Sequence, residues 1–197
     1  MNLLLVDNHD SFTWNLVELL RRHGKVNVKI LLPENLNLSE INNYDRIIFS
    51  PGPGLPEEQP TMFKILDQIH DHIPVFGVCL GLQAIAQYFG AGLYNLCGVL
   101  HGQSRRLKIL LPGHFLFRGI PDGTEVGLYH SWAIDQATLP GCLDLLALSS
   151  DGIIMSLAHK TLPICGVQFH PESFITPLGQ HLLDNWLDHF ISLQKNP

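Results

Sequence analysis

The sequence predicts an α/β fold, with a mostly parallel central sheet that carries helices on both faces and a smaller set of antiparallel strands. Two observations support this prediction. In the first half, short apolar runs alternate with segments of helical periodicity, which is the pattern of a parallel sheet. The second half is richer in short apolar runs and closes with one helix. We expect a single domain over residues 1–197, with functional sites at the carboxyl ends of the strands.

The expected elements of the first half are bounded by turn residues. In chain order they are a strand at 2–6, a helix at 11–23, strands at 26–32 and 46–49, a helix at 61–72, a strand at 74–78 and a helix at 80–89. In the second half, strands are expected at 107–110, 125–129, 143–147, 153–158 and 164–169. The last helix has one apolar stripe at helical spacing, formed by Leu178, Leu182, Leu183, Trp186, Leu187, Phe190 and Ile191.

Composition excludes several classes of function. With 46% hydrophobic residues the chain can form a closed core, and a formal charge of −6 without a basic cluster excludes an electrostatic footprint for nucleic acid or an anionic membrane. No apolar run approaches the roughly 20 residues that span a bilayer. Asp7 and Asp10 come too early for a signal peptide. We expect a cytoplasmic protein whose ligand is small or is another protein.

The cysteines are candidate nucleophiles. Cys79, Cys97, Cys142 and Cys165 are far apart and form no C-x-x-C pair, which argues against both a disulfide framework and a thiolate zinc site. We therefore expect all four to be reduced.

The segment Gly77-Val78-Cys79-Leu80-Gly81 stands where an apolar run passes directly into a helix. This is the thiol version of the nucleophile elbow, a sharp turn that strains its central residue and requires small flanking residues. A thiolate at the start of the helix would face unpaired N–H groups and the positive end of the helix dipole. The pattern favours Cys79 as a nucleophile, although a cysteine between glycines is more often a packing residue.

The segment His170-Pro171-Glu172 follows the apolar run at 164–169. A thiol nucleophile needs a base that takes its proton and returns it to the leaving nitrogen, and the imidazole needs an acceptor that fixes its tautomer. His170 and Glu172 can fill these two roles, with Pro171 holding an extended turn. In isolation, a histidine at a strand end and a solvated glutamate would also explain the pair.

A Pro-Gly-Pro-Gly loop at 51–54 follows the run that ends at Phe49. Such a loop exposes backbone N–H groups, and a pair of donors, those of Gly52 and Leu80, would stabilise an oxyanion by about 3 to 4 kcal/mol per donor. An ordinary turn is the alternative explanation of such a string. However, the three motifs follow three separate strands of one predicted parallel sheet, which favours a shared site over three coincidences.

Together these motifs resemble those of the class I (triad) glutamine amidotransferases. Residues 77–83 are similar to the nucleophile motif of that family, and residues 166–173 to its histidine-glutamate motif, almost letter for letter. The likeness runs from the first residue to the last helix. Within the class, residues 6–16, 50–54 and 129–131 are similar to the small subunit of anthranilate synthase and to the amidotransferase subunit of aminodeoxychorismate synthase.

The resemblance implies a flavodoxin-like core and a glutaminase reaction. Cys79 would attack the carboxamide of glutamine, His170 would act as general base and then as acid, and Glu172 would orient His170. A γ-glutamyl thioester would form, ammonia would leave, and water would release glutamate. The residues implied to hold glutamine and the oxyanion are Gly52, Pro53, Gly54, Leu80, Gln83, His130 and Ser131. Otherwise, Gln83 is simply a polar position on a helix, and His130 and Ser131 end a strand.

The resemblance also implies a partner. Ammonia would pass to a chorismate-using synthase subunit, because the glutaminase takes up all 197 residues. The sequence does not distinguish anthranilate synthesis from aminodeoxychorismate synthesis, in the tryptophan and folate pathways respectively. No metal or organic cofactor is expected in this chain, and a requirement for Mg²⁺ would belong to the partner.

The chain departs from the subfamily pattern at three positions. The subfamily usually has Tyr at His9, His at Leu82, and Lys at Gln103. In the family the segment around Gln103 lies toward the synthase, so Gln103 and the adjacent Arg105-Arg106 bear on the identity of the partner. None of the three departures touches the proposed triad. Asp10 and Ser11 are expected to cap the first helix, or to lie on the rim that faces the partner.

Three other classes are weighed against this interpretation. An α/β-hydrolase would place its acid before the histidine, whereas Glu172 follows His170. A γ-glutamyl hydrolase would use the same Cys and His, and ammonia release from free glutamine separates the two. A non-catalytic binding module would usually have lost the cysteine or the histidine.

Overall fold

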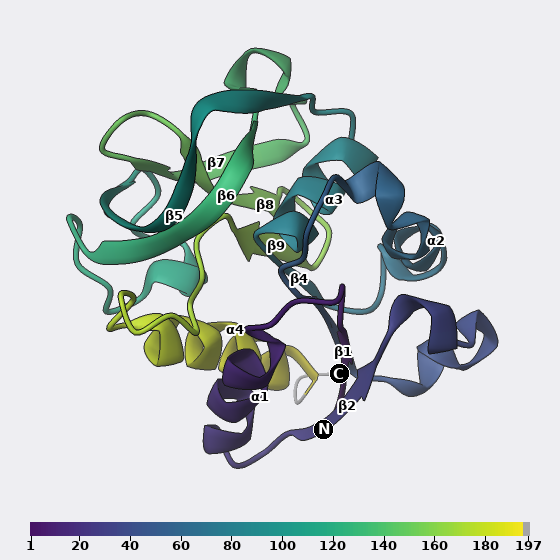
Figure 1. The fold of residues 1–197 in the computed structure, drawn as a ribbon. Helices are drawn as coiled ribbons and strands as arrows, with labels where there is room; N and C mark the ends of the chain where they lie inside the picture. The colour runs from purple at the N-terminus through teal and green to yellow at the C-terminus, as the bar shows by residue number, and fades with distance from the viewer. Residues whose placement is uncertain (195–197) are drawn as a thin grey trace.

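The computed structural model describes residues 1–194, with the side chains of Val99 and of residues 191–194 outside that description. Within it the strands form a single nine-stranded sheet, in the order β2-β1-β3-β4-β9-β8-β7-β5-β6 (Figure 1). Ile191, the last member of the predicted apolar stripe, is among the side chains that are not described.

The first five strands of the sheet are parallel. They are β2 (Asn27–Leu31), β1 (Asn2–Val6), β3 (Arg46–Phe49), β4 (Val75–Val78) and β9 (Ile164–Val167). β1, β3, β4 and β9 are almost wholly apolar and buried, as expected for strands covered on both faces, whereas the edge strand β2 is only partly buried. Their carboxyl ends therefore lie along one edge of the sheet.

The remaining strands are antiparallel. They are β8 (Ile154–His159), β7 (Leu143–Ser149), β5 (Leu93–Ile109) and β6 (Glu125–Ile134). Because β8 pairs with β9, this half continues the parallel half without a break, and long β6 comes back toward the end of β9, where Gly127 forms an isolated antiparallel bridge with His170.

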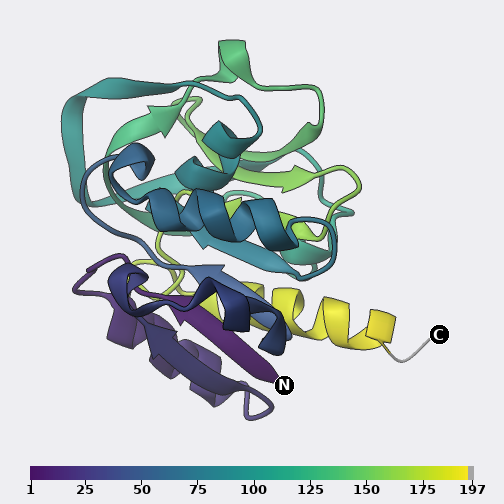
Figure 2. The ribbon, with the colours of Figure 1, turned by 90° about the vertical axis from the view of Figure 1, so that its right-hand side faces the viewer.

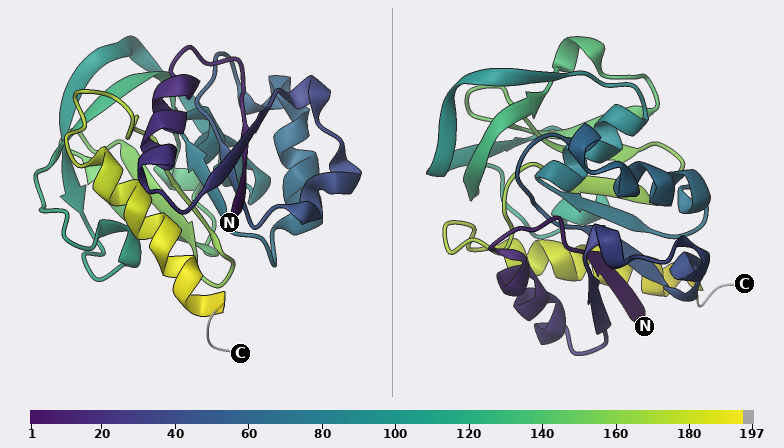
Figure 3. Two further views of the ribbon diagram at one scale, coloured as in Figure 1. Left: turned by 90° about the horizontal axis from the view of Figure 1, so that it is seen from below. Right: turned by 45° about the vertical axis from the view of Figure 1, so that its right-hand side comes forward.

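The helices cover both faces of the parallel strands. α1 (Thr13–Arg22) and α4 (Gly179–Gln194) lie side by side on one face (Figure 3), and α2 (Pro60–Ile69) and α3 (Leu80–Tyr88) pack together on the other (Figure 2). Five short 3₁₀ helices occur in connections, namely η1 (Pro33–Asn35), η2 (Leu38–Asn43), η3 (Pro56–Glu58), η4 (Phe115–Phe117) and η5 (Gln136–Thr138).

The side chains of β1 alternate between two apolar clusters, one on each face of the sheet. Leu3 and Leu5 belong to the apolar cluster beneath α1 and α4, whereas Leu4 and Val6 belong to the cluster beneath α2 and α3. All four side chains are fully buried. Consecutive residues of a strand point to opposite faces, so a wholly apolar run is required where helices cover both.

The clearest difference from the sequence prediction is the length of β5. The prediction placed a strand only at 107–110, whereas β5 begins at Leu93. Most of the additional residues are exposed, and register shifts occur between Asn95 and Leu100 and between His101 and Gln103. The strand therefore lacks the regular alternation of apolar residues by which strands are recognised.

No helix among the described residues is long and apolar enough to cross a membrane.

Candidate active site

The three sequence motifs lie at the carboxyl ends of three neighbouring strands. β3 is followed by the loop at 50–54, β4 by Cys79, and β9, after two intervening residues, by His170. Since β3, β4 and β9 are adjacent and parallel, the motifs meet at one edge of the sheet.

Cys79 occupies a strained elbow. Its backbone has φ 52° and ψ −104° at the N-cap of α3, a conformation that costs a non-glycine residue energy and needs support from its surroundings. A Cβ atom on Gly77 would lie 2.5 Å from the backbone of Gly81, and one on Gly81 would lie 2.5 Å from the carbonyl oxygen of Phe49. Both glycines are therefore required for the strand to turn so tightly into the helix.

His170 and Glu172 form a buried pair. Nδ1 of His170 and Oε1 of Glu172 are 2.7 Å apart, and their side chains are 3% and 0% exposed. A carboxylate can only accept, so Nδ1 carries the proton, and Nε2, which has no hydrogen-bond partner among the described residues, is left to exchange protons with a nucleophile. Burial lowers the pKa of His170, but its interactions with Cys79 and Glu172 raise that pKa well above 6.5.

The loop that carries His170 is held by β6. The backbone N–H of His170 donates to the carbonyl oxygen of Gly127 at 3.0 Å. The hydroxyl of Thr176 accepts from the N–H of Gly127 at 3.0 Å and donates to the carbonyl oxygen of His170 at 2.7 Å. The rings of Phe12 and Tyr129 meet the imidazole edge-on at centroid distances of 5.9 and 4.9 Å. The imidazole is thus fixed from several sides.

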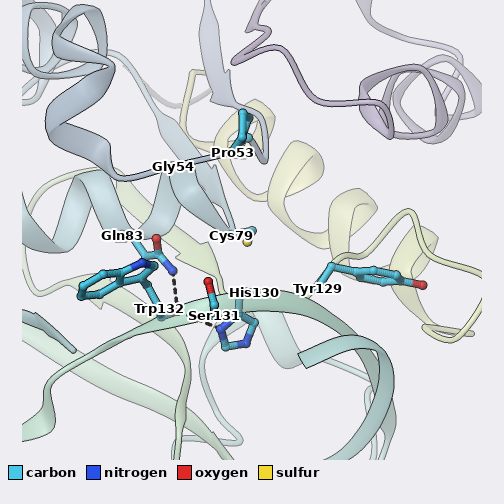
Figure 4. Close-up of a pocket in the computed structure, with 9 residues that line it drawn as sticks. Pro53, Gly54, Cys79, Gln83, Tyr129, His130, Ser131 and Trp132 are labelled. Atoms are coloured by element: carbon cyan, nitrogen blue, oxygen red, sulfur yellow. Dashed lines mark hydrogen bonds between the residues drawn. The ribbon is translucent and has the colours of Figure 1, made fainter. Parts of the chain in front are cut away.

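A pocket of about 130 Å³ opens beside the sulfur of Cys79 (Figure 4). Its lining residues are Gly52, Pro53, Gly54, Cys79, Gln83, Tyr129, His130, Ser131 and Trp132. All of the residues predicted to hold glutamine line it except Leu80, whose predicted contribution is a backbone N–H group. Its size suits a ligand no larger than an amino acid.

His130 and Ser131 lie within β6, beyond the predicted strand end at Tyr129. The hydroxyl of Ser131 points toward Cys79, whereas the ring of His130 lies on the other side of the strand (Figure 4). Nδ1 of His130 donates to the carbonyl oxygen of Trp132 at 2.8 Å. Burial lowers the pKa of His130 to about 4, so its imidazole is neutral near pH 7. A role of His130 in binding, through its backbone, stays a prediction.

The two residues predicted to supply the oxyanion donors are in contact. A Cβ atom built on Gly52 would lie 2.8 Å from the Cδ2 atom of Leu80, so the loop packs directly on the start of α3. Leu80 is the first residue of that helix, where N–H groups have no partner within the helix. Ser50 holds the loop in place, because its hydroxyl accepts from the N–H of Asn8 at 2.9 Å.

A second pocket, of about 310 Å³, reaches Cys79 from the side of His170. It shares Gly52, Pro53, Cys79 and Tyr129 with the first pocket, and its other lining residues are His9, Asp10, Ser11, Phe12, Pro51, His101 and His170. The sulfur can thus be approached from two directions.

Asp10 and Ser11 line this second pocket and do not cap α1. The helix begins at Thr13, and its N-cap, Phe12, has no side-chain cap. Asp10 instead accepts from the N–H of Phe12 at 2.7 Å, a turn that precedes the helix. Burial raises the pKa of Asp10, while the hydrogen bond from Phe12 and the charge of His170 lower it.

The comparisons with known proteins agree with this geometry. The family model for class-I glutamine amidotransferases matches residues 4–190. This chain belongs to the class-I glutamine amidotransferase family. It is 43% identical, over 95% of its length and 96% of the relative, to a Haemophilus influenzae protein described as "Putative anthranilate synthase component II". It is 35% identical, over 95% of its length and 96% of the relative, to the aminodeoxychorismate/anthranilate synthase component 2 of Bacillus subtilis.

A solved structure gives the same fold. A Thermoplasma acidophilum protein, described as a component of a "putative GMP synthase", superposes with a TM-score of 0.87 at 27% identity, covering 100% of this chain and 98% of that one. The fold predicted from the sequence and the resemblance to the amidotransferase family are thereby confirmed.

The three departures have different environments in this amidotransferase. Leu82 is fully buried in the apolar cluster between α3 and the antiparallel strands. His9 lines the second pocket and lies 3.2 Å from Glu34. Gln103 is exposed on β5 and accepts from Arg105 at 3.1 Å. Only His9 thus borders a pocket that reaches the nucleophile.

The sequence did not assign a role to two side chains at the amidotransferase site. Trp132 lines the first pocket, and Gln168 contacts the sulfur of Cys79. Gln168 precedes His170 by two residues, so in an extended chain both would lie on the same side, a signal that was available. Among the described residues, no group of three His, Cys, Asp or Glu side chains is placed to hold a metal ion.

Proposed function

We propose that this amidotransferase is a glutaminase subunit that hydrolyses L-glutamine and delivers ammonia to a chorismate-using synthase subunit. The observation that carries the proposal is the position of Cys79. Its sulfur lies beside the buried His170–Glu172 pair and borders both a small pocket and a second opening.

The geometry supports a two-step reaction. Nε2 of His170 takes the thiol proton, and the sulfur of Cys79 attacks the carboxamide carbon of glutamine in the first pocket. The N–H groups of Gly52 and Leu80 stabilise the oxyanion. His170 then gives the proton to the leaving nitrogen, so ammonia and a γ-glutamyl thioester form. Water, deprotonated by His170, cleaves the thioester and releases glutamate.

The second pocket supports transfer to a partner. Glutamine enters one side of the sulfur, and ammonia can leave through the side lined by Asp10, His9 and His101. Because the first pocket is occupied by the glutamyl group after the first step, a separate exit allows ammonia to leave before water completes the reaction. The exit is therefore proposed to face the synthase.

The identity of the acceptor rests on the relatives. The Haemophilus influenzae and Bacillus subtilis proteins are described as second components of anthranilate or aminodeoxychorismate synthases, and the Klebsiella aerogenes aminodeoxychorismate synthase component 2 is 38% identical over 94% of this chain. The structure described as part of a GMP synthase is only 27% identical. The relatives in sequence therefore favour chorismate as the acceptor of ammonia over the acceptors served by other proteins of this fold.

Reconstitution tests the proposal. The chain is combined in turn with an anthranilate synthase component I and an aminodeoxychorismate synthase component I, and product formation from chorismate is followed with glutamine or with ammonia, in the presence of Mg²⁺. We expect glutamine to support amination only when this chain is present, and ammonia to replace it. The proposal would be overturned if this chain formed an aminated product from glutamine in the absence of both synthases. Cleavage of γ-glutamyl peptides in preference to glutamine would also overturn it.

A further inference from the structure

Gln168 makes direct contact with the nucleophile. Its Nε2 atom lies 3.4 Å from the sulfur of Cys79, and its Oε1 atom lies 3.1 Å from Nε2 of Gln83. Gln168 is fully buried. It thus connects the nucleophile to a residue that lines the first pocket.

The direction of these hydrogen bonds is fixed by a backbone carbonyl. The carbonyl oxygen of Trp132 can only accept, and the side chain of Gln83 lies 2.8 Å from it, so Gln83 must present its NH₂ group there. The second hydrogen of that group then points to Gln168, which must accept it with Oε1. The NH₂ group of Gln168 is consequently the one that faces the sulfur.

The same chain of bonds orients Gln83. Since both hydrogens of its amide are used on Trp132 and Gln168, its Oε1 remains as an acceptor, and it points away from Trp132 (Figure 4). Gln83 lines the pocket, so it offers a carbonyl oxygen to an N–H group of a ligand.

Gln168 is held rigidly. Its backbone N–H donates to the carbonyl oxygen of Met155 on β8 at 2.8 Å, directly after β9 ends at Val167. Two paired strands therefore fix its backbone, and the hydrogen bond from Gln83 fixes its side chain.

We propose that Gln168 is a further catalytic residue, which donates an N–H hydrogen bond to the thiolate of Cys79. A neutral amide stabilises the anion without titrating itself, so the donor is available at every pH. Hydrogen bonds to charged groups are the stronger ones. The bond favours the thiolate before attack and again when the thiolate leaves the γ-glutamyl carbon during thioester hydrolysis. The inference builds on the proposed glutaminase reaction, but its first test needs only the thiol.

That test is the pH dependence of alkylation of Cys79 by iodoacetamide, with the modified residue mapped by mass spectrometry. Gln168→Met keeps the length of the side chain and removes the donor, and Gln168→Glu replaces the donor with an acceptor. We expect the midpoint of the rate-versus-pH curve to move to higher pH by about one unit in Gln168→Met, and further in Gln168→Glu. Gln87→Met is the matched control, because Gln87 lies on α3 but lines neither pocket. An unchanged midpoint in folded Gln168→Met would overturn the proposal.

A measurement on the unaltered chain does not depend on the folding of a variant. The side-chain amide of Gln168, followed by ¹⁵N NMR, should shift with the same pH midpoint as alkylation, and the shift should vanish after Cys79 is alkylated. An amide chemical shift that does not change when the thiol is deprotonated or alkylated would contradict the proposal.

Glutaminase assays then test the consequence for catalysis, using the complex with the synthase partner. We expect kcat to fall about tenfold in Gln168→Met, with the loss smaller at high pH, where more thiolate forms without the donor. A merely structural defect would lower activity equally at all pH values. If the alkylation shift is found but no glutaminase activity exists in any form of the complex, the proposed function fails while the hydrogen bond stands.

Discussion

The backbone N–H of Cys79 donates a hydrogen bond to the carbonyl oxygen of Val167 at 2.8 Å. This bond continues the ladder between β4 and β9, in which Val78 is paired with Val167. The nucleophile and the segment that carries the base therefore leave the sheet side by side. The distance between the two reactive groups is set by the register of a rigid parallel pair, although they are far apart in the sequence.

Replacing Cys79 tests its role as nucleophile. We expect Cys79→Ala to lower glutamine-dependent synthase activity by at least about 10³-fold, because Cys79 is the only cysteine among the described residues that line the two pockets. Activity with ammonia should be unchanged, since ammonia bypasses the glutaminase. Cys142→Ala is the control, as Cys142 lines neither pocket. Labelling by a reactive glutamine analogue at Cys142, Cys97 or Cys165 in place of Cys79 would contradict the assignment.

Glu172→Gln keeps a hydrogen-bond acceptor beside His170 but removes the negative charge of the carboxylate. The carboxylate of Glu172 is one of the groups that raise the pKa of His170 against the opposing effect of burial. With an amide there, that pKa falls, so the protonated imidazole that must serve the leaving nitrogen is lost at lower pH. We expect kcat to drop about 10²- to 10⁴-fold and the alkaline limb of its pH profile to move to lower pH.

The same variant makes a prediction about stability. Because the pKa of His170 is raised in the folded protein, the folded chain binds the proton more tightly, and this contribution is present below pH 6.5 and is lost as pH rises through the raised value. The difference in unfolding free energy between the original chain and Glu172→Gln should therefore shrink as pH rises. Urea unfolding at several pH values measures it, and a difference that grows with pH would refute the explanation.

Gly81→Ala should disrupt the elbow. An added Cβ would lie 2.5 Å from the carbonyl oxygen of Phe49 on β3, so α3 or β3 must shift to admit it. We expect the unfolding free energy to fall by about 1 to 3 kcal/mol, with a loss of glutaminase activity from displacement of α3. Gly141→Ala is the matched control, because nothing lies within 4 Å of a Cβ there. Equal stability of both variants in urea unfolding would show that the elbow tolerates a side chain.

The sequence predicted the parallel half of the fold well because four of its five strands, β1, β3, β4 and β9, are buried and read as short apolar runs. It also placed Cys79, His170 and the loop at 50–54 at strand ends, since each directly follows such a run. It missed the first part of β5, whose residues face solvent, and the contact of Gln168 with the nucleophile. The spacing of Gln168 and His170 indicated that the two share a side of the chain, but the orientation of the Gln168 amide depends on the hydrogen bonds that Gln83 donates to Gln168 and to the carbonyl oxygen of Trp132 on β6. Only the pairing of distant segments reveals these bonds.

Phe174 is expected to contact the synthase. It is 93% exposed, which is unusual for a large apolar side chain, and it follows the triad residue Glu172 by two positions in the chain. We expect Phe174→Ser to weaken binding of the synthase, with a Kd about 10- to 100-fold higher and no loss of fold. Leu111→Ser is the control, because Leu111 is 42% exposed but lies beside Leu146 on β7, whereas Phe174 follows Ser173, which is hydrogen-bonded to Tyr129 of both pockets. Equal affinities of the two variants in a titration with the synthase would exclude Phe174 from the interface.

His130 should control acid stability. Burial lowers its pKa from 6.5 to about 4 in the folded protein, so between these pH values the unfolded chain binds one more proton than the folded chain. The unfolding free energy must then rise with pH across this window, and the contribution is lost as pH falls, by about 3 kcal/mol in all. In His130→Gln, whose amide can still donate to the carbonyl of Trp132, this part of the slope should disappear. His101→Gln, at an exposed position on β5 with no carboxylate partner among the described residues, should keep the slope of the original chain. Urea unfolding at intervals from pH 4 to pH 7 distinguishes the two, and an unaltered slope in His130→Gln would mean that His130 is already charged in the folded protein.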